Sequence, residues 1–551
     1  MNRRKYRAKA SFLGICACLA AAFLLLCASP SYVLAEDKYW IGGSGYWNDP
    51  ANWDPYGIPA FDIVYLTSSD AIDRTVILDE RLYLDSLYID AAGSETITLE
   101  ILQDSGFDVP GKLEIGVNGT ATINQSGGSV TDVWNAGFYL GSGGTYNLSG
   151  GGMALFYMPI DGMFNQSGGS VYGESLSLRG TYNLSAGEIN EFSDFGHLEI
   201  YETGTFNQSG GLHLEPIGSR IMGGTYNLSG GQFTTDGAPN YGLQIENNGT
   251  FSQTGGSTFL SAGGSIDDTS TYNLAGGALT ANRWYYPEIP SILNNGTFNY
   301  SGGSMYLRLE DGTENEGIFI NNGTANLSGN GTRTVNGNVV NNGTWKTTHT
   351  TAEYTGTFTN NGAYISDSAA QYFADLIVGE SGYLVAQFKD EFYIGGDFIN
   401  HSMMNNDWNT MHAYLAFFEG SDNLHDVYLT GVDYGQTMSG YAKNFSWGTW
   451  DITDDYLTLY DGNQELGAGL YLREIWGAEI TPEMVVANLI GFDDLTVYYM
   501  PHLPGNEYLG GFAYNLPGGG QLAPVPEPAT ILLLTSGLVG LAGFRRKFRK
   551  R

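Results

Sequence analysis

The sequence predicts an all-β protein whose central part is a right-handed parallel β-helix, also called a β-solenoid. Three observations lead to this prediction. Glycine accounts for 78 of the 551 residues, about twice its usual share of ~7%. A short unit rich in glycine, threonine and asparagine recurs between residues 117 and 363. Apolar and polar residues alternate within that unit, as they do in a strand that buries one face.

The repeated unit reads Gly-Thr, an aromatic or apolar residue, Asn, Leu or Gln, Ser and Gly-Gly, and residues 144–151 show it clearly. Self-similarity at a fixed period indicates a repeat architecture, so the spacing of the copies identifies its type. Successive copies start 18 to 27 residues apart, the length of one solenoid coil. After Gly144 they begin at Gly162, Gly180, Gly204, Gly224, Gly249, Ser270, Gly296 and Gly323.

One copy, residues 225–231, shows why the unit forms a strand and then a corner. In a strand, Tyr226 and Leu228 lie on one face and the intervening polar residues on the other. The glycine pair that follows can adopt the positive φ values that a corner requires. A single coil cannot bury its apolar face, so we expect stacked coils with aromatic ladders. Further turns are expected at Asn248-Gly249, Asn295-Gly296, Asn322-Gly323 and Asn342-Gly343.

The copies alternate between leucine and glutamine at one inward-facing position. Leucine stands at residues 148, 184, 228 and 274, and glutamine at residues 125, 166, 208 and 253. A buried glutamine needs partners for its amide. Either the glutamines stack on glutamine-bearing neighbours, or this face of the strand is only partly buried.

The segment before the repeats, residues 36–116, is expected to form an N-terminal β cap region. Trp40, Trp47 and Trp53 lie there in a glycine-rich stretch. The stretch resembles the opening of exported β-solenoid and autotransporter-like passenger proteins, and the resemblance implies a cap over the first coil, whose strand edges would otherwise be unpaired. The alternative is a sugar-binding platform, on which exposed indole rings stack.

The segment after the repeats, residues 364–515, is expected to be a C-terminal β-rich region. It contains strand-like runs such as residues 456–460 and 495–499. Residues 516–528 are rich in glycine and proline and are interpreted as a linker to the C-terminal segment.

The charged residues are distributed unevenly along the chain. Lysine and arginine number 24 and aspartate and glutamate 58, which gives a formal charge of −34. Eleven basic residues lie at the two ends, so the remainder has 24 − 11 = 13 basic against 58 acidic residues, a charge of −45. Phosphate contacts need clustered basic residues, so this balance argues against a nucleic-acid partner.

The N-terminal residues 1–35 have the features of a secretory signal peptide. A basic start leads into an apolar run, and Val33-Leu34-Ala35 is a small-residue site of the kind that signal peptidase cleaves. A membrane anchor is the alternative. All three cysteines lie in this segment, so cleavage after Ala35 removes every thiol and with it disulfides and thiol catalysis.

The C-terminal residues 529–551 combine a short apolar helix with a basic tail. The apolar run 529–544 would extend about 24 Å as a helix, which is marginal for a bilayer. Pro526, Glu527 and Pro528 stand directly before it. The positive-inside rule places the basic tail on the cytoplasmic side. That tail consists of Arg545, Arg546, Lys547, Arg549, Lys550 and Arg551.

Pro-Glu-Pro, an apolar helix and a terminal basic cluster, in this order, resemble the PEP-CTERM sorting signal that exosortase enzymes recognise in Gram-negative bacteria. The resemblance implies an exosortase-like processing enzyme as a partner. It also implies a transient anchor in the inner membrane, followed by delivery to the cell surface or extracellular matrix. A plain C-terminal anchor is the alternative.

No catalytic residue, cofactor or metal site is predicted. Basic residues are scattered through the repeats, and no nucleophile motif, phosphate loop or dinucleotide fingerprint occurs. The acidic patch of Asp451, Asp454, Asp455 and Asp461 could hold calcium but lacks EF-hand spacing. His401, His412 and His425 match no ligand pattern and are expected to be satisfied or exposed.

We therefore expect an exported, non-enzymatic surface or matrix protein that associates with exopolysaccharide in a biofilm matrix. Its ladders of asparagine, threonine and serine would supply many weak hydrogen bonds, and repetition would supply the affinity. Two alternatives remain: a surface polysaccharide lyase or hydrolase built on a β-helix, and an adhesin.

Overall fold

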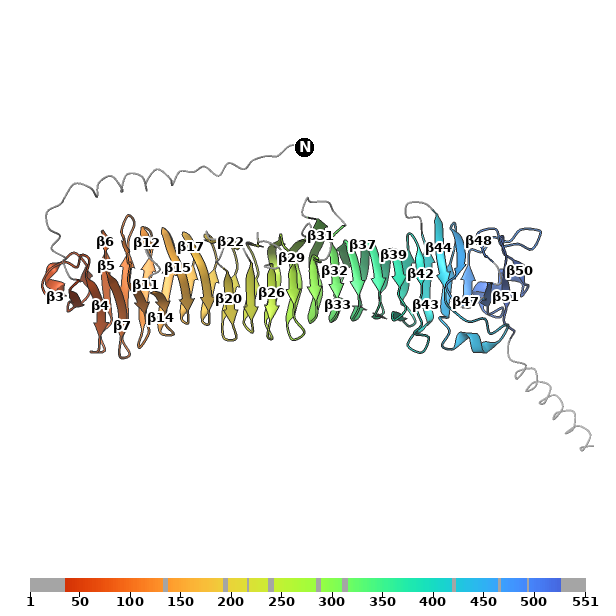
Figure 1. The fold of residues 1–551 in the computed structure, drawn as a ribbon, viewed down its shortest axis with the longest axis horizontal. Helices are drawn as coiled ribbons and strands as arrows, with labels where there is room; N and C mark the ends of the chain where they lie inside the picture. The colour runs from red at the N-terminus through yellow and green to blue at the C-terminus, as the bar shows by residue number, and fades with distance from the viewer. Residues whose placement is uncertain are drawn as a thin grey trace, which may run out of the picture.

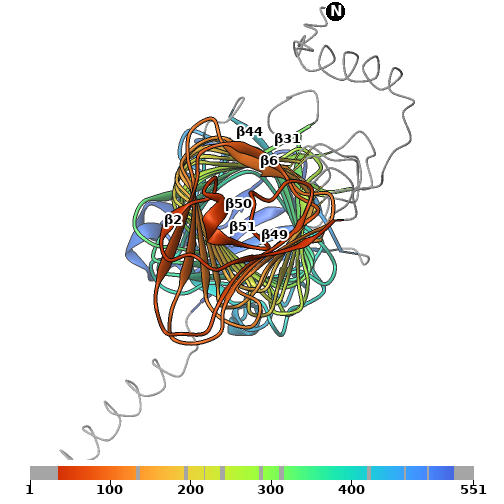
Figure 2. The ribbon, with the colours of Figure 1, turned by 90° about the vertical axis from the view of Figure 1, so that its left-hand side faces the viewer.

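The computed structural model describes residues 35–526, except 132–136, 192–196, 216–217, 236–241, 284–288, 310–315, 419–422, 464–466 and 493–494. These residues form a long rod of stacked coils, in which the chain advances from one end to the other (Figure 1). In the end-on view the coils superpose as a three-sided tube (Figure 2). The predicted all-β solenoid is confirmed.

The coils contribute strands to three columns, which the chain visits in the order one, two, three. The strands confined to column one are β1 (Asp37–Trp40), β4 (Ile63–Ser68), β7 (Ser86–Ala91), β10 (Lys112–Ile115), β13 (Gly137–Leu140), β20 (Leu198–Tyr201), β23 (Ser219–Met222), β26 (Leu243–Glu246), β28 (Gly264–Ile266), β30 (Ile292–Asn294), β32 (Ile318–Asn321), β35 (Asn338–Asn341), β42 (Phe398–Asn400), β44 (Leu424–Leu429), β46 (Tyr456–Asp461) and β48 (Leu489–Ile490).

Column two stacks the strands in which the repeated unit lies. The strands confined to it are β2 (Gly45–Tyr46), β5 (Arg74–Leu78), β8 (Ile97–Ile101), β11 (Ala121–Gln125), β14 (Gly144–Leu148), β16 (Met163–Gln166), β18 (Thr181–Leu184), β21 (Thr205–Gln208), β24 (Thr225–Leu228), β33 (Thr324–Ser328), β36 (Thr344–Thr348), β38 (Ala363–Asp367) and β40 (Tyr383–Val385).

Column three follows the glycine corner of each coil. The strands confined to it are β6 (Arg81–Tyr83), β9 (Gly106–Asp108), β12 (Ser129–Thr131), β19 (Glu188–Glu191), β22 (Leu212–Glu215), β25 (Gln232–Thr235), β34 (Thr332–Asn336), β41 (Glu391–Ile394), β43 (Thr410–Phe417), β45 (Trp447–Asp451), β47 (Gly469–Trp476), β49 (Thr496–Tyr499) and β51 (Gln521–Pro524).

Seven longer strands bend round a corner and serve two columns. Those that run from column two into column three are β27 (Thr250–Leu260), β29 (Thr271–Arg283) and β31 (Thr297–Leu309). Those that run from column three into column one are β15 (Gly152–Ile160), β17 (Ser170–Leu178), β37 (Thr351–Asn360) and β39 (Ala370–Val378). With these four, column one holds 16 + 4 = 20 strands, so the described rod has about 20 coils.

Pairing between coils is parallel, and the antiparallel pairs among the named strands of the described chain lie at the two ends. There β3 (Trp53–Asp54) pairs with β1, and β50 (Tyr514–Asn515) pairs with β51. The short 3₁₀ helices η1 (Pro50–Asn52), η2 (Met438–Tyr441) and η3 (Pro504–Leu509) also lie in the end regions. Inward side chains from Trp40 to Leu522 form one contiguous apolar core.

The corners are made as the sequence predicts at the glycine pairs. Gly231 has a φ of 79°, and a Cβ there would lie 2.5 Å from the carbonyl oxygen of Gly211 in the coil below. The Asn-Gly turns use glycine differently. A Cβ at Gly343 would lie 2.2 Å from the Gly323 oxygen, so close stacking of coils requires that glycine. Both requirements follow from coils that stack at strand spacing.

The first coil is closed by the three tryptophans of the N-terminal stretch. Trp40, Trp47 and Trp53 are buried, and Trp53 makes edge contacts with the other two at centroid distances of 5.0 and 4.7 Å. The Trp53 indole donates a hydrogen bond of 2.8 Å to the Trp47 carbonyl. Buried rings cannot stack on a sugar, so the alternative of a sugar-binding platform is wrong for these residues.

Coil stacking continues through the segments on both sides of residues 117–363. Parallel pairing joins β7 to β10 and β10 to β13 across residue 117, and β36 to β38 and β38 to β40 across residue 363. The boundaries at these positions therefore mark changes in sequence pattern within one continuous solenoid.

The predicted linker at residues 516–528 is partly wrong. Residues 521–524 form β51, which pairs with β49 and β50, and Leu522, Ala523 and Val525 are buried. The glycines that suggested flexibility form a tight turn, in which Gly518 and Gly520 have φ values of 86° and 83°. The last coil therefore extends to Val525.

Candidate functional site

The repeated unit places a row of asparagines on the outer face of column two. The coils stack residue on residue, so Asn183 pairs in register with Asn207, and Asn207 with Asn227. Each amide donates to the asparagine of the coil below, over 2.9 Å from Asn207 to Asn183 and 2.9 Å from Asn227 to Asn207. The row comprises Asn124, Asn147, Asn165, Asn183, Asn207, Asn227, Ser252, Asn273, Asn299 and Asn326.

Threonines form a second row beside the asparagines. Thr205, Thr225 and Thr250 lie in register two residues before the asparagine position and are half-buried, like the asparagines themselves. We call the two rows together the polar ladder. Its rungs repeat at the spacing of stacked strands, about 4.8 Å. The threonine row comprises Thr181, Thr205, Thr225, Thr250, Thr271, Thr297, Thr324 and Thr344.

The polar ladder retains hydrogen-bonding capacity after its internal bonds are made. An asparagine amide has two N–H donors and two acceptor lone pairs. A ladder asparagine such as Asn207 uses one donor toward Asn183 and one lone pair toward Asn227. One donor and one lone pair per rung are left for an outside partner. The ladder can therefore present a regular array of weak donor and acceptor sites.

The glutamines of the repeat face inward and are fully buried, and neither of the two expected arrangements holds. Each glutamine lies between aliphatic residues of the neighbouring coils: Gln125 lies between Ile101 and Leu148, and Gln208 lies between Leu184 and Leu228. The Gln208 amide donates to the Gln232 carbonyl over 2.9 Å, and its Oε1 accepts from the Tyr226 hydroxyl over 2.6 Å.

The same bridge recurs along the repeat region, with the tyrosine always on the next coil. The Oε1 atoms of Gln125, Gln166, Gln208 and Gln253 accept from Tyr146, Tyr182, Tyr226 and Tyr272 respectively. The coils with Leu148, Leu184, Leu228 and Leu274 carry tyrosine two residues earlier, whereas the glutamine coils carry phenylalanine or, at Ile123, isoleucine. Burial raises the pKa of Tyr182 well above its usual range. The bridges therefore join neighbouring coils in pairs on the inner side of the strands that carry the polar ladder.

In later coils, buried asparagines form the hydrogen bonds that join neighbouring coils. Asn321 is fully buried and donates to Asn341 Oδ1 over 2.7 Å and to the Thr344 carbonyl over 2.9 Å. The next residue, Asn322, is exposed and donates over 2.8 Å to Asn295. Two parallel asparagine ladders, one inside and one outside, therefore run through residues 294–361.

A groove of about 560 Å³ opens where column three turns into column one in the last third of the rod. It is lined by Glu353, Tyr354, Thr355, Tyr372, Phe373, Ala374, Asp375, Gly395, Gly396 and Phe418. Tyr372 stacks on Tyr393 at a centroid distance of 4.4 Å, and the exposed Phe418 meets Tyr372 edge to face at 6.1 Å. We call this the aromatic groove.

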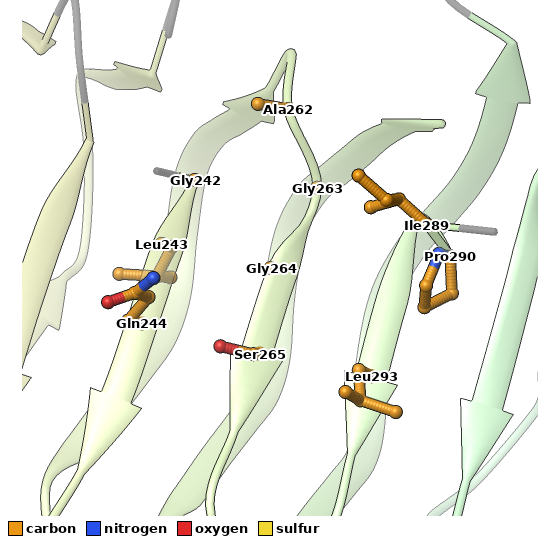
Figure 3. Close-up of a pocket in the computed structure, with 10 residues that line it drawn as sticks. All are labelled: Gly242, Leu243, Gln244, Ala262, Gly263, Gly264, Ser265, Ile289, Pro290 and Leu293. Atoms are coloured by element: carbon orange, nitrogen blue, oxygen red, sulfur yellow. The ribbon is translucent and has the colours of Figure 1, made fainter. Parts of the chain in front are cut away.

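A smaller hollow of about 250 Å³ lies on the outer face of column one, across β26, β28 and β30 (Figure 3). It exists because Gly264 and Ser265 are small, so the outward row that runs from Gln244 to Leu293 has a gap between them. Its polar side chains are those of Gln244 and Ser265. The described residues that line this hollow include no acid, base or nucleophile pair suited to catalysis.

The residues weighed as metal ligands do not converge. Within the described part of the chain, no three histidine, cysteine or carboxylate side chains are placed to hold a metal ion. Asp451 accepts from Tyr414 and Thr453, while Asp461 accepts from the backbone of Asn463 and Gly467.

The three histidines weighed as ligands have separate surroundings. His425 is buried beside Asp455, with ring nitrogens 2.6 Å from the Gly396 carbonyl and 3.3 Å from the Asp455 carboxylate. His412 contacts Arg473, and His401 packs edge-on against Tyr428.

One buried histidine was not anticipated from the sequence. His213 contacts the Glu215 carboxylate, and its Nδ1 lies 2.9 Å from the Tyr226 hydroxyl, which itself donates to Gln208. All four side chains are buried. Burial lowers the pKa of His213 to about 3, so the imidazole is neutral at neutral pH. The group is enclosed in the core and is a structural network.

The sorting and cleavage residues fall at the two limits of the described chain. Ala35 and Pro526 are both exposed, and Pro526 follows directly on the buried Val525. Glu527, Pro528, the apolar run 529–544, the basic tail and residues 1–34 lie outside the described residues. Among the described residues, no helix combines the length and apolarity that a bilayer crossing demands.

A continuous solenoid with a half-buried polar ladder on its outer face, followed at once by a sorting sequence, defines an exported repeat protein. The chain carries a PEP-CTERM protein-sorting motif: the model of that motif matches residues 524–547. The motif implies export, transient membrane anchoring, and processing by exosortase and signal peptidase. No curated protein matches the chain. No solved structure matches it either.

Proposed function

We propose that this is a non-enzymatic surface or matrix protein of a Gram-negative bacterium, whose polar ladder associates with exopolysaccharide. The observation that carries the proposal is the row of asparagines in register from Asn124 to Asn326, with Ser252 at one rung and threonines beside it. Polysaccharide hydroxyl groups both donate and accept hydrogen bonds, and each asparagine of the polar ladder has one unused N–H donor and one unused acceptor lone pair. Each contact is weak, and many contacts along one rigid face raise the avidity.

The charge of the body favours an uncharged or cationic polymer. Outside the two basic ends, 13 basic residues face 58 acidic ones, a charge of −45. A polyanionic polysaccharide would be repelled by a body of this sign. The proposed partner is therefore a polymer whose hydroxyl or amino groups meet the ladder without a carboxylate or sulfate on every unit.

A non-catalytic role is supported by what the outer faces offer. Hydrolysis of a glycosidic bond by retaining or inverting enzymes needs two carboxyl groups that flank the bond, one of them a proton donor. The hydroxyl and amide groups of the polar ladder supply neither. The aromatic groove does have two carboxylates in its lining, Glu353 and Asp375, and turnover is therefore an explicit outcome of the test.

The test compares ladder variants with a matched control. Asn207→Ser and Asn227→Ser copy what the chain already has at Ser252, to which Asn273 donates over 3.2 Å, so the fold should tolerate them. The control is Asn322→Ser with Asn342→Ser, which alters the exposed asparagine ladder outside column two. We expect the first pair to weaken binding to purified exopolysaccharide several-fold and the control pair to bind normally.

Three results would count against the proposal. Equal binding by both pairs would remove the polar ladder from the site. New reducing ends or unsaturated products during incubation would favour the lyase or hydrolase alternative. Binding to foreign cells or abiotic surfaces, without binding to the producer's own polymer, would favour an adhesin.

A further inference from the structure

We propose that the aromatic groove binds an amino sugar that carries a free ammonium group, within a polysaccharide chain. The inference rests on the proposed polysaccharide partner and narrows its chemistry. The groove joins an aromatic wall to two carboxylates, Glu353 and Asp375, and the described residues that line it include neither lysine nor arginine. Its volume of about 560 Å³ lies in the range of small-ligand sites and accommodates more than one sugar ring.

The aromatic wall of the groove leaves the ring of Phe418 available to a ligand. Tyr372 has one face covered by Tyr393 at 4.4 Å, and the Tyr393 hydroxyl is tied to Glu391 over 2.9 Å. Phe418, which is 37% exposed, packs edge to face with Tyr372 at an interplanar angle of 73°. A ring placed at this angle presents a π-face on which the C–H groups of a sugar or an ammonium group can pack.

The floor of the groove is kept open by two glycines. A Cβ at Gly395 would lie 3.0 Å from Cζ of Phe418, and a Cβ at Gly396 would lie 2.2 Å from Oδ1 of Asp375. Any other residue at either position would displace the ring or the carboxylate. The glycine pair therefore allows the Phe418 ring and the Asp375 carboxylate to lie where they do in the groove.

Both carboxylates keep acceptor capacity for a ligand. Asp375 accepts from the backbone N–H of Asp397 over 3.0 Å and from the Thr357 hydroxyl over 3.3 Å. Glu353 accepts from the Thr334 hydroxyl over 3.1 Å. A carboxylate has about four acceptor sites, so each has unused ones.

Charge complementarity then selects the ligand. Among the described residues, no lysine or arginine forms an ion pair with Glu353 or Asp375. An ammonium group can donate up to three charge-assisted hydrogen bonds, and an acetylated amine loses that charge. The body charge of −45 attracts the same polycation at long range. An amino-sugar polymer therefore fits better than a neutral one.

The test uses the exported protein purified from the cells that make it, with defined oligosaccharides as probes. Titration calorimetry compares a glucosamine hexamer, an N-acetylglucosamine hexamer and a hexamer of lysine. We expect the glucosamine hexamer to bind at least ten-fold more tightly than either of the others. We also expect its affinity to fall as salt is raised, because screening weakens exposed charge pairs.

Variants of the groove residues test whether the glucosamine hexamer binds in the aromatic groove. Glu353→Gln and Phe418→Ala should each weaken binding of the glucosamine hexamer about ten-fold. Glu380→Gln removes an exposed carboxylate outside the groove and should change the affinity less than two-fold. Equal binding of the two sugar hexamers, tighter binding of the lysine hexamer, or full affinity in both groove variants would overturn the inference. The ladder variants Asn207→Ser and Asn227→Ser report separately on the proposed function, which survives if only the groove fails.

Discussion

Removal of the Tyr182 hydroxyl tests the glutamine bridge that fastens neighbouring coils. Tyr182 is fully buried and donates to Gln166 Oε1 over 2.6 Å. In Tyr182→Phe this oxygen stays fully buried between Leu148 and Leu184 of the neighbouring coils and loses the hydroxyl from which it accepts. A buried acceptor left without a partner costs about 1–3 kcal/mol. We expect the free energy of local opening of these coils to fall by that amount.

The assay must measure local opening, because a stack of coils contacts only its nearest neighbours and does not unfold in two states. Native-state hydrogen exchange of the amides in residues 166–188 reports that opening. A cost of about 1–3 kcal/mol corresponds to exchange roughly five- to 150-fold faster there, with distant coils unchanged.

Two further sets of substitutions test the glutamine bridge. Replacing both partners, in Gln166→Leu with Tyr182→Phe, should be less harmful than Tyr182→Phe alone, because no orphaned amide oxygen remains. The converse change, Phe164→Tyr, places a hydroxyl one coil earlier, against Leu148, and should destabilise the stack until Leu148→Gln restores an acceptor. Unchanged exchange in Tyr182→Phe, or no rescue by either second change, would show that the bridge contributes nothing.

Three other predictions concern the core and the sorting sequence. Asn321→Ala removes buried bonds and should cost about 2–4 kcal/mol, whereas its exposed neighbour Asn322→Ala should cost less than ~0.5 kcal/mol, both measured by native-state hydrogen exchange of the surrounding coils; equal costs would contradict the two-ladder arrangement. His213 has a pKa lowered to about 3, so the unfolded chain binds the extra proton below pH 6.5. Stability should therefore fall as pH drops from 6.5 toward 3, and a non-titrating His213→Gln variant should fall less; parallel pH profiles would contradict this. Replacing Pro526, Glu527 and Pro528 with alanine should leave the protein in the membrane fraction, and normal release would contradict processing at that motif.

The fold followed from the sequence because the repeat encodes it locally. Alternation in residues 225–229, the glycine corner after it and the 18- to 27-residue spacing are all short-range signals, and the strands pair at the spacing that the copies predict. The same signals fade after residue 363, yet the coils continue to Val525. There, aromatic packing such as that of Phe392 against Trp447 fills the core in place of the repeated residues. The local sequence pattern does not predict these contacts.

The candidate sites were less accessible to sequence reasoning. The polar ladder follows directly from the outward asparagine position. The glutamine bridges do have a signal in the sequence: in neighbouring copies tyrosine accompanies leucine, and phenylalanine or, at Ile123, isoleucine accompanies glutamine. The aromatic groove had none, because Glu353, Asp375 and Phe418 lie on different coils and meet only through the register of stacking. The linker prediction failed because glycine and proline mark tight turns as well as flexible segments.

The most direct test of a non-enzymatic, polysaccharide-binding solenoid is one co-sedimentation experiment. The exported protein is incubated with exopolysaccharide purified from its own producer, and bound protein and new reducing ends are measured in the same samples. We predict saturable binding that Asn207→Ser with Asn227→Ser weakens, with no increase in reducing ends over time. Absence of binding, or steady release of reducing ends, would contradict the proposed function.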